Sequence, residues 1–195
     1  MRGNEERKAP TDVVGEGERR YLLNMKVRRQ LEALEPLILD PVNGLKEEDW
    51  HVAPAGKWSV GQIVDHLATS LDLVAGAFES RADKQDMNRR SSPRQSLFRH
   101  LVLSAGKLPK GRKTPPQAAP DDRPDPELIT AEFRMGVERT ARLTEGWATE
   151  RQVAVFVAHP VLGDLNLPEW VRFHYVHCRH HAHQLEVRLR WLAAR

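Results

Sequence analysis

Four segments of this chain carry apolar residues at intervals of three and four, the spacing of one face of an α-helix. They lie at about 18–39, 60–78, 125–147 and from 166 towards the C-terminus. Each segment has a single apolar stripe, which must be buried against another element. The pattern therefore predicts an all-α fold, an antiparallel four-helix bundle. The stretch "QVAVFVAHPVLG" suggests one short extended segment, for which the sequence shows no partner strand.

Local signals indicate where three of the helices begin. Ser59 and Gln62 have the spacing of a capping box, in which each side chain bonds the other residue's backbone N–H. Asn166 and Glu169 repeat that spacing before the last helix. Asp125, followed by a proline, is a suitable N-cap for the third. The sequence thus predicts both where these helices start and that each start is stabilised locally.

The parts outside these helices are polar. Residues 1–17 suggest a disordered tail, which leaves 18–195 as one bundle domain. Helices two and three are separated by a long connection, 81–123, with a short helix expected at about 96–104. This connection holds eleven Lys or Arg and four Asp or Glu, is rich in proline and has few aromatic residues. Without interleaved aromatics to stack on bases, we expect a solvated connection and no nucleic-acid binding.

Composition points to a cytoplasmic protein. The balance of 40% hydrophobic and 29% charged residues is ordinary for a globular domain. No run approaches the ~18 apolar residues of a membrane span, and "MRGNEERKAP" lacks the apolar stretch of a signal peptide. A single cysteine excludes an internal disulfide framework and fits a reducing compartment. We therefore expect no membrane partner.

Five of the nine histidines fall in "HYVHCRHHAH", residues 174–183 of the last helix. At ~100° per residue, His174, His177 and His181 share the apolar arc of that helix. His180 and His183 point away, towards solvent or a partner. Helical geometry alone therefore divides the cluster into an inner and an outer set.

The inner set is suited to hold a metal ion. His177 and His181 are four residues apart, so their rings lie one turn above the other and can share an ion at ~2.0–2.1 Å. His66, at the edge of the apolar stripe of the second helix, could supply a third ligand. Four-helix bundles build metal sites from inward side chains in this way. His174, one turn earlier on the same face, would then support the site or line the pocket mouth. The alternative is that these are hydrogen-bonded core histidines.

Two stretches carry a family resemblance. "KWSVGQIVDHL" followed by "HCRHHAHQLE" resembles the DinB-like superfamily of metal-dependent helical bundles. "HPVLGDLNLPEWVRFHYVHCRHHAHQLE" is similar to its DUF1569 branch, although Val161 stands where that branch has an aromatic residue. The likeness covers about 20–190. It implies that His66, His177 and His181 bind one divalent metal ion, for which we expect zinc or nickel, and iron next.

The resemblance also implies a chemistry. Three neutral histidines leave an open coordination position, as in catalytic zinc sites. DinB-like proteins are associated with hydrolysis and with transfer reactions of low-molecular-weight thiols such as bacillithiol or mycothiol. If the bundle is an enzyme, we therefore expect a small-molecule substrate such as a low-molecular-weight thiol. The competing hypothesis is a non-catalytic bundle that acts as a structural or interaction protein.

Six further residues have candidate roles. His159, just before the last helix, is the candidate catalytic base, or else it caps a turn of the chain. Arg188 lies two turns beyond His181 and could meet an anionic substrate or form a structural ion pair. Cys178 has the position of a small core residue. Apolar residues near the C-terminus, among them Trp191, Val187 and Leu192, suggest a homodimer.

Overall fold

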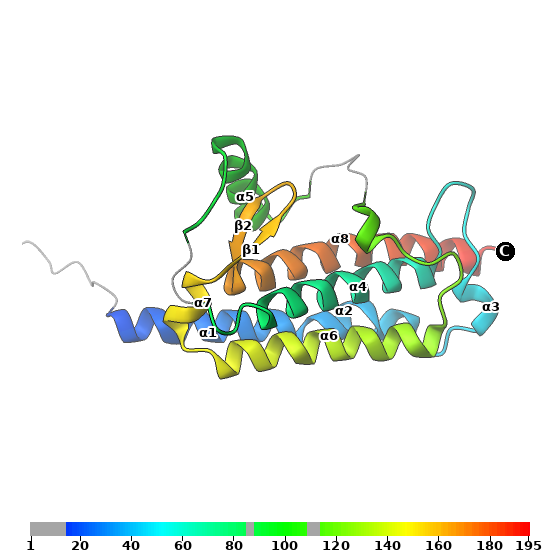
Figure 1. Ribbon diagram of the computed structural model, residues 1–195. Helices are drawn as coiled ribbons and strands as arrows, with labels where there is room; N and C mark the ends of the chain where they lie inside the picture. The colour runs from blue at the N-terminus through cyan, green and yellow to red at the C-terminus, as the bar shows by residue number, and fades with distance from the viewer. Residues whose placement is uncertain (1–14, 85–87, 109–113) are drawn as a thin grey trace, which may run out of the picture.

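The chain folds into a bundle with four columns, and its computed structural model describes residues 15–84, 88–108 and 114–195 (Figure 1). The first column is α1 (Glu16–Glu32) continued by α2 (Leu34–Ile38), and the others are α4 (Val60–Glu79), α6 (Pro126–Gly146) and α8 (Leu167–Ala193). The shorter elements are η1 (Asp40–Val42), α3 (Glu47–Trp50), α5 (Pro93–Ala105), η2 (Pro116–Ala118), α7 (Thr149–Ala154), β1 (Phe156–His159) and β2 (Gly163–Asn166). The predicted all-α bundle is confirmed. Most of the expected 1–17 tail lies outside the described residues, and α1 already begins at Glu16.

The predicted helix starts are confirmed at atomic detail. Ser59 and Gln62 form a complete capping box at α4, and Asn166 and Glu169 form another at α8. The Asp125 side chain accepts hydrogen bonds from two backbone N–H groups of the first turn of α6. The starts of the two helices that carry the candidate ligands are therefore stabilised by their own sequences.

The helix expected at 18–39 is instead two helices, α1 and α2, which meet at Ala33. The cause is Pro36, which has no N–H to donate and whose ring would clash with the carbonyl of the residue four positions earlier. That residue is Glu32, where α1 ends.

Helix directions in the bundle follow an uneven pattern. Helix α8 runs antiparallel to α4, as expected, whereas α4 and α6 run in the same direction (Figure 1). The contacts show this parallel pairing. Leu71 of α4 lies against Gly136 of α6, and Glu79, later in α4, pairs with Arg139, later in α6. Two parallel neighbours need a connection that returns along the length of the bundle, which explains why the 80–125 segment is so long.

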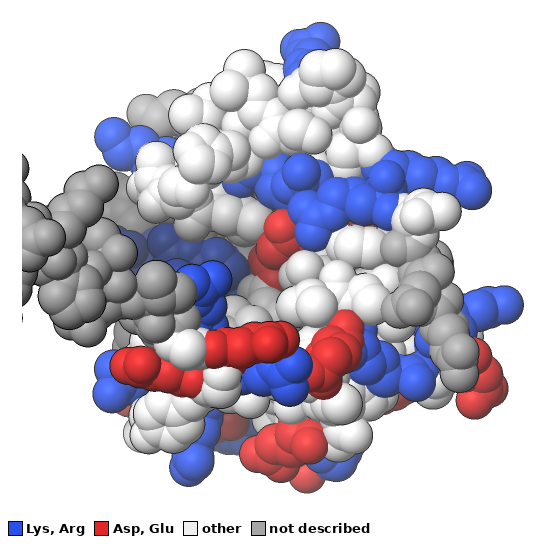
Figure 2. Space-filling view, turned by 90° about the vertical axis from the view of Figure 1, so that its left-hand side faces the viewer, with Lys and Arg blue, Asp and Glu red and all other residues white. Residues whose placement is uncertain are grey.

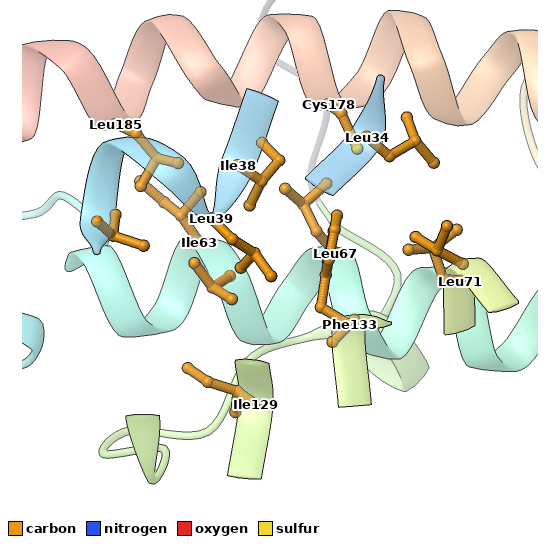
Figure 3. Close-up of a cluster of buried hydrophobic side chains, with 14 of the residues drawn as sticks. Leu34, Ile38, Leu39, Ile63, Leu67, Leu71, Ile129, Phe133, Cys178 and Leu185 are labelled. Carbon is orange, nitrogen blue, oxygen red and sulfur yellow. The ribbon is translucent and has the colours of Figure 1, made fainter. Parts of the chain in front are cut away.

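The core lies between the four columns (Figure 3). Apolar side chains from α2, α4, α6 and α8 meet there, including Ile38, Leu67, Phe133 and Leu185. Cys178 belongs to this cluster, as predicted, and burial raises the pKa of its thiol well above the ordinary range. A second apolar cluster joins the far end of α4 to α5, the β-strands and the start of α8. The two clusters together fix α4 and α8 side by side.

The short extended segment expected in "QVAVFVAHPVLG" is present as β1, and it has a partner that the sequence did not indicate, because β1 and β2 pair as an antiparallel hairpin. The register sets Phe156 opposite Asn166 and His159 opposite Gly163. The second strand reads "GDLN", and Gly, Asp and Asn are depleted in strands, so its sequence gives little signal. The Trp170 indole N–H donates to the Val157 carbonyl at 3.0 Å, which holds the hairpin on α8.

The basic connection is attached to the bundle at several points. Arg89 makes a bidentate ion pair with Glu169, and the backbone N–H of Asp121 donates to Asp65 at 2.7 Å. Figure 2, a view of the end where α1 begins, shows Lys and Arg side chains in a band beside acidic ones. Among the described residues, no helix has the length and apolarity needed to cross a membrane.

Candidate metal centre

Three histidine side chains from two helices converge on one point. The Nε2 atom of His177 lies 3.2 Å from Nε2 of His66 and 3.0 Å from Nε2 of His181. All three potential ligand atoms lie within 4.8 Å of one another. These are the three residues that the spacing and the resemblance selected. The structure therefore brings the predicted set together, from the middle of α4 and the middle of α8.

The spacing of these nitrogens fits a shared ion. Two ligands at ~2.0–2.1 Å from a tetrahedral metal are roughly 3.4 Å apart, which is close to the observed separations. The Nδ1 atom of His66 donates to the Ala118 carbonyl at 2.7 Å, and Nδ1 of His181 donates to Gln184 Oε1 at 2.9 Å. With Nδ1 protonated, each of these rings presents an Nε2 lone pair. Two lone pairs that face one point repel each other, and a cation or a proton on His177 Nε2 would relieve this repulsion.

Burial and mutual repulsion favour the neutral form of all three imidazole rings. Burial lowers the pKa of His66 and His177. Burial and the neighbouring imidazoles together lower the pKa of His181 to about 3, and neighbouring imidazoles also lower the pKa of His177, because two positive charges at this distance repel. All three are therefore neutral at physiological pH, which is the state that binds a metal.

The cluster opens into a pocket of about 1000 Å³. Apolar and aromatic side chains from α4, α8 and the hairpin form most of its walls, and residues 114–118 of the connection form another. Trp58 lies beside the histidine cluster, with its ring stacked 6.2 Å from that of His181 and tilted 5.1 Å from that of His66. No Asp or Glu lines the pocket within the described residues. A bound molecule would meet a mostly apolar surface with the three histidines at one side.

His159 lines this pocket and also caps a turn. Its Nδ1 accepts hydrogen bonds from the backbone N–H groups of Val161 and Leu162, at 3.0 and 3.1 Å. The ring packs 4.5 Å from that of Phe173, and burial lowers its pKa to about 4. Because Nδ1 is an acceptor, the proton lies on Nε2. His159 therefore offers the pocket a hydrogen-bond donor.

The other histidines of α8 lie where the helical wheel assigned them, with one refinement. His180 and His183 are exposed, as predicted, yet both border the mouth of the same pocket. His174 is buried against Trp170 and is not part of the pocket lining. Its Nε2 has no hydrogen-bond partner among the described residues. His174 thus packs behind the site and does not lie at its mouth.

Three groups that contact the three histidine rings were not predicted from the sequence. Gln184 follows His181 by three residues, a helical spacing that could have identified it. Trp58 directly precedes the capping box of α4, and no sequence pattern indicates its contact with the rings. The Ala118 carbonyl is a backbone group on a distant segment, and no side-chain pattern signals it.

A bundle with a three-histidine cluster in an apolar pocket defines a class of helical proteins with a candidate metal centre. Comparison with known families places the chain more closely. The DinB superfamily matches residues 30–185, so the chain belongs to that superfamily. Searches of curated proteins and of solved structures gave no match.

The buried histidines make a prediction for stability against pH. Burial lowers the pKa of His159 to about 4 and of His174 to about 3, whereas both titrate near ~6.5 in the unfolded chain. Below pH ~6.5 the unfolded state binds more protons, so stability falls as the pH drops towards 4. Each group contributes up to about 1.4 kcal/mol per pH unit. Urea titrations of metal-free protein at several pH values measure this slope. His174→Phe should make it shallower, whereas replacing the exposed His100 with Gln should leave it unchanged, and equal slopes in all three proteins would contradict the prediction.

Proposed function

We propose that this DinB-superfamily protein is a metal-dependent enzyme, with His66, His177 and His181 as the ligands of one divalent ion. The observation that carries the proposal is the convergence of three Nε2 atoms. In two of these rings, His66 and His181, the Nδ1–H group already donates a hydrogen bond to another protein group. A core histidine would be expected to satisfy both of its nitrogens with protein groups. Here the free nitrogens face one another beside a pocket large enough for a small molecule.

The donor set also favours a chemistry. Three neutral imidazoles suit zinc or nickel, with iron as the next candidate. A divalent ion held there supplies Lewis-acid chemistry, because it lowers the pKa of a water or a thiol that it binds. The protein contributes an apolar wall that excludes water, and His159 contributes an Nε2–H donor towards the substrate. We propose hydrolysis or the transfer of a low-molecular-weight thiol, with His159 as the hydrogen-bonding catalytic residue.

The homodimer expected from the C-terminal apolar residues remains a part of this proposal, and Val187 among them borders the pocket.

The test is metal content followed by reactivity. Protein purified without a histidine tag should carry about one zinc, nickel or iron ion per chain in elemental analysis, because three oriented imidazoles bind such ions tightly. The loaded protein is then screened with model esters and with thiols and electrophiles. A chain that stays free of metal, even after dialysis against zinc and nickel, would refute the proposed function.

A further inference from the structure

One cation beside the pocket, Arg188, has no counter-charge among the residues that the structure describes. Arg188, on α8, is only 8% exposed and its side chain lines the pocket. Its Nε atom is buried without a hydrogen-bond partner, and no carboxylate among the described residues forms an ion pair with the guanidinium. The structural ion pair considered from the sequence is therefore missing. Burial lowers the pKa of this group, and no acidic neighbour raises it again.

A buried, unpaired guanidinium is costly. Arginine stays charged in proteins, so the cost cannot be relieved by loss of a proton. In a folded protein such a charge is normally paired or hydrogen-bonded. The surrounding pocket offers it no carboxylate, since its lining contains no Asp or Glu within the described residues. The remaining source of a counter-charge is the molecule that binds in the pocket.

We propose that Arg188 recognises a carboxylate of the substrate, whose reacting end lies at His66, His177 and His181; this deepens the proposed function and rests on it. The guanidinium carries a planar fork of N–H donors that matches a carboxylate with two parallel hydrogen bonds. Lys57, which also lines the pocket, adds a second positive charge at its rim. The lining thus selects an anionic small molecule.

The helix sets the size of that molecule. Arg188 follows His181 by seven residues, so their Cα atoms are about 10 Å apart along α8. Side chains on a helix lean towards its N-terminus, so the longer arginine side chain can extend back towards the histidines. The pocket lining also includes the apolar side chains of Trp58 and Val187. The substrate class is therefore a short chain with a reactive group at one end, a carboxylate at the other and an apolar middle.

The experiment compares an acid with its uncharged amide. Binding of 4-mercaptobutanoate and of 4-mercaptobutanamide is measured by calorimetry on zinc-loaded and on zinc-free protein. The acid should bind wild-type protein at least tenfold more tightly than the amide, which corresponds to about 1.4 kcal/mol. Arg188→Gln should remove this preference without change in metal content, and Arg188→Lys should retain part of it, because lysine keeps the charge but not the fork.

Three results would overturn the proposal: equal binding of acid and amide by wild type, a preference that survives in Arg188→Gln, or no binding of either probe. Metal content is measured separately. If the protein binds no metal, the proposed function is refuted. The preference of zinc-free protein for the acid over the amide still tests the role of Arg188.

Thermal stability separates recognition from a structural role. Arg188→Met keeps the aliphatic packing and removes an unpaired buried charge, so the melting temperature should rise by about 2–4 °C. Exposed Arg190, paired with Glu186, supplies the control, because Arg190→Met should have little effect. A clear fall in the melting temperature of Arg188→Met would show that the residue supports the fold, and would overturn the proposal.

Discussion

Replacing His177 or His181 with alanine is expected to lower bound metal at least about tenfold and to destabilise the protein, because two imidazoles hold an ion far more weakly than three. The ion binds only the folded chain, so its loss removes stability by mass action. At a metal concentration of about 100 times Kd this amounts to ~2.7 kcal/mol. His66→Ala should behave in the same way, although that ligand lies on the other helix. Elemental analysis and thermal unfolding with added zinc measure the two effects.

The same helix supplies matched controls. His183→Ala removes an identical side chain from an exposed position, where the nearest charged partner is Glu186 at 3.6 Å. His180→Ala is the second control, and its ring contacts Gln184 at 3.1 Å. Both variants should keep their metal. If His177→Ala and His183→Ala lowered metal content equally, the division into inner and outer histidines would be refuted.

The second large effect concerns the contact between the two parallel helices. A Cβ atom added at Gly136 would lie 2.7 Å from Cβ of Leu71, closer than two carbons can approach. Gly136→Val should therefore lower the free energy of unfolding by about 1–3 kcal/mol, the usual cost of overpacking. A helix gains ~1 kcal/mol when glycine becomes alanine, so Gly136→Ala should suffer less. Urea denaturation followed by circular dichroism measures both variants.

Two further variants test that explanation. Gly146→Ala changes a glycine of the same helix that has no neighbour within 4 Å, and it should be neutral or stabilising. Combining Gly136→Val with Leu71→Gly should recover part of the loss, because Leu71→Gly removes the Cβ atom that takes part in the clash, whereas alanine would keep it. A double variant as unstable as the sum of the two single variants would contradict the steric account.

Much of the site could be predicted because helices turn spacing into position. The separation of His177 and His181 by one turn, and the capping boxes that fix the starts of α4 and α8, are local properties of the sequence. A pair of ligands on one helix and a third on a facing helix then follow from bundle packing. The all-α fold class follows from the same periodicity.

The parts that could not be predicted depend on contacts between distant segments. The hairpin partner "GDLN" has low strand propensity, and it is held by its pairing with β1 and by the connection, where Ser91 accepts a hydrogen bond from the Asp164 backbone N–H. The parallel course of α4 and α6 depends on how the connection returns, which apolar periodicity does not encode. The absence of a carboxylate beside Arg188 among the described residues is likewise seen only in the folded structure. The spacing in α8 is compatible both with a structural ion pair and with contact to an anionic substrate.

The hydrogen bond from His66 to Ala118 links two parts of the chain that are 52 residues apart. It fixes the tautomer in which His66 can hold an ion, and at the same time it attaches the returning connection to α4. Thermodynamic reciprocity then applies: whatever this bond adds to the affinity for the ion, the ion adds to the attachment of the connection. The connection also forms a wall of the pocket. If the proposed ion binds, loading the centre would thus also firm the wall of the pocket, and the metal-free chain would have a less firmly assembled binding surface.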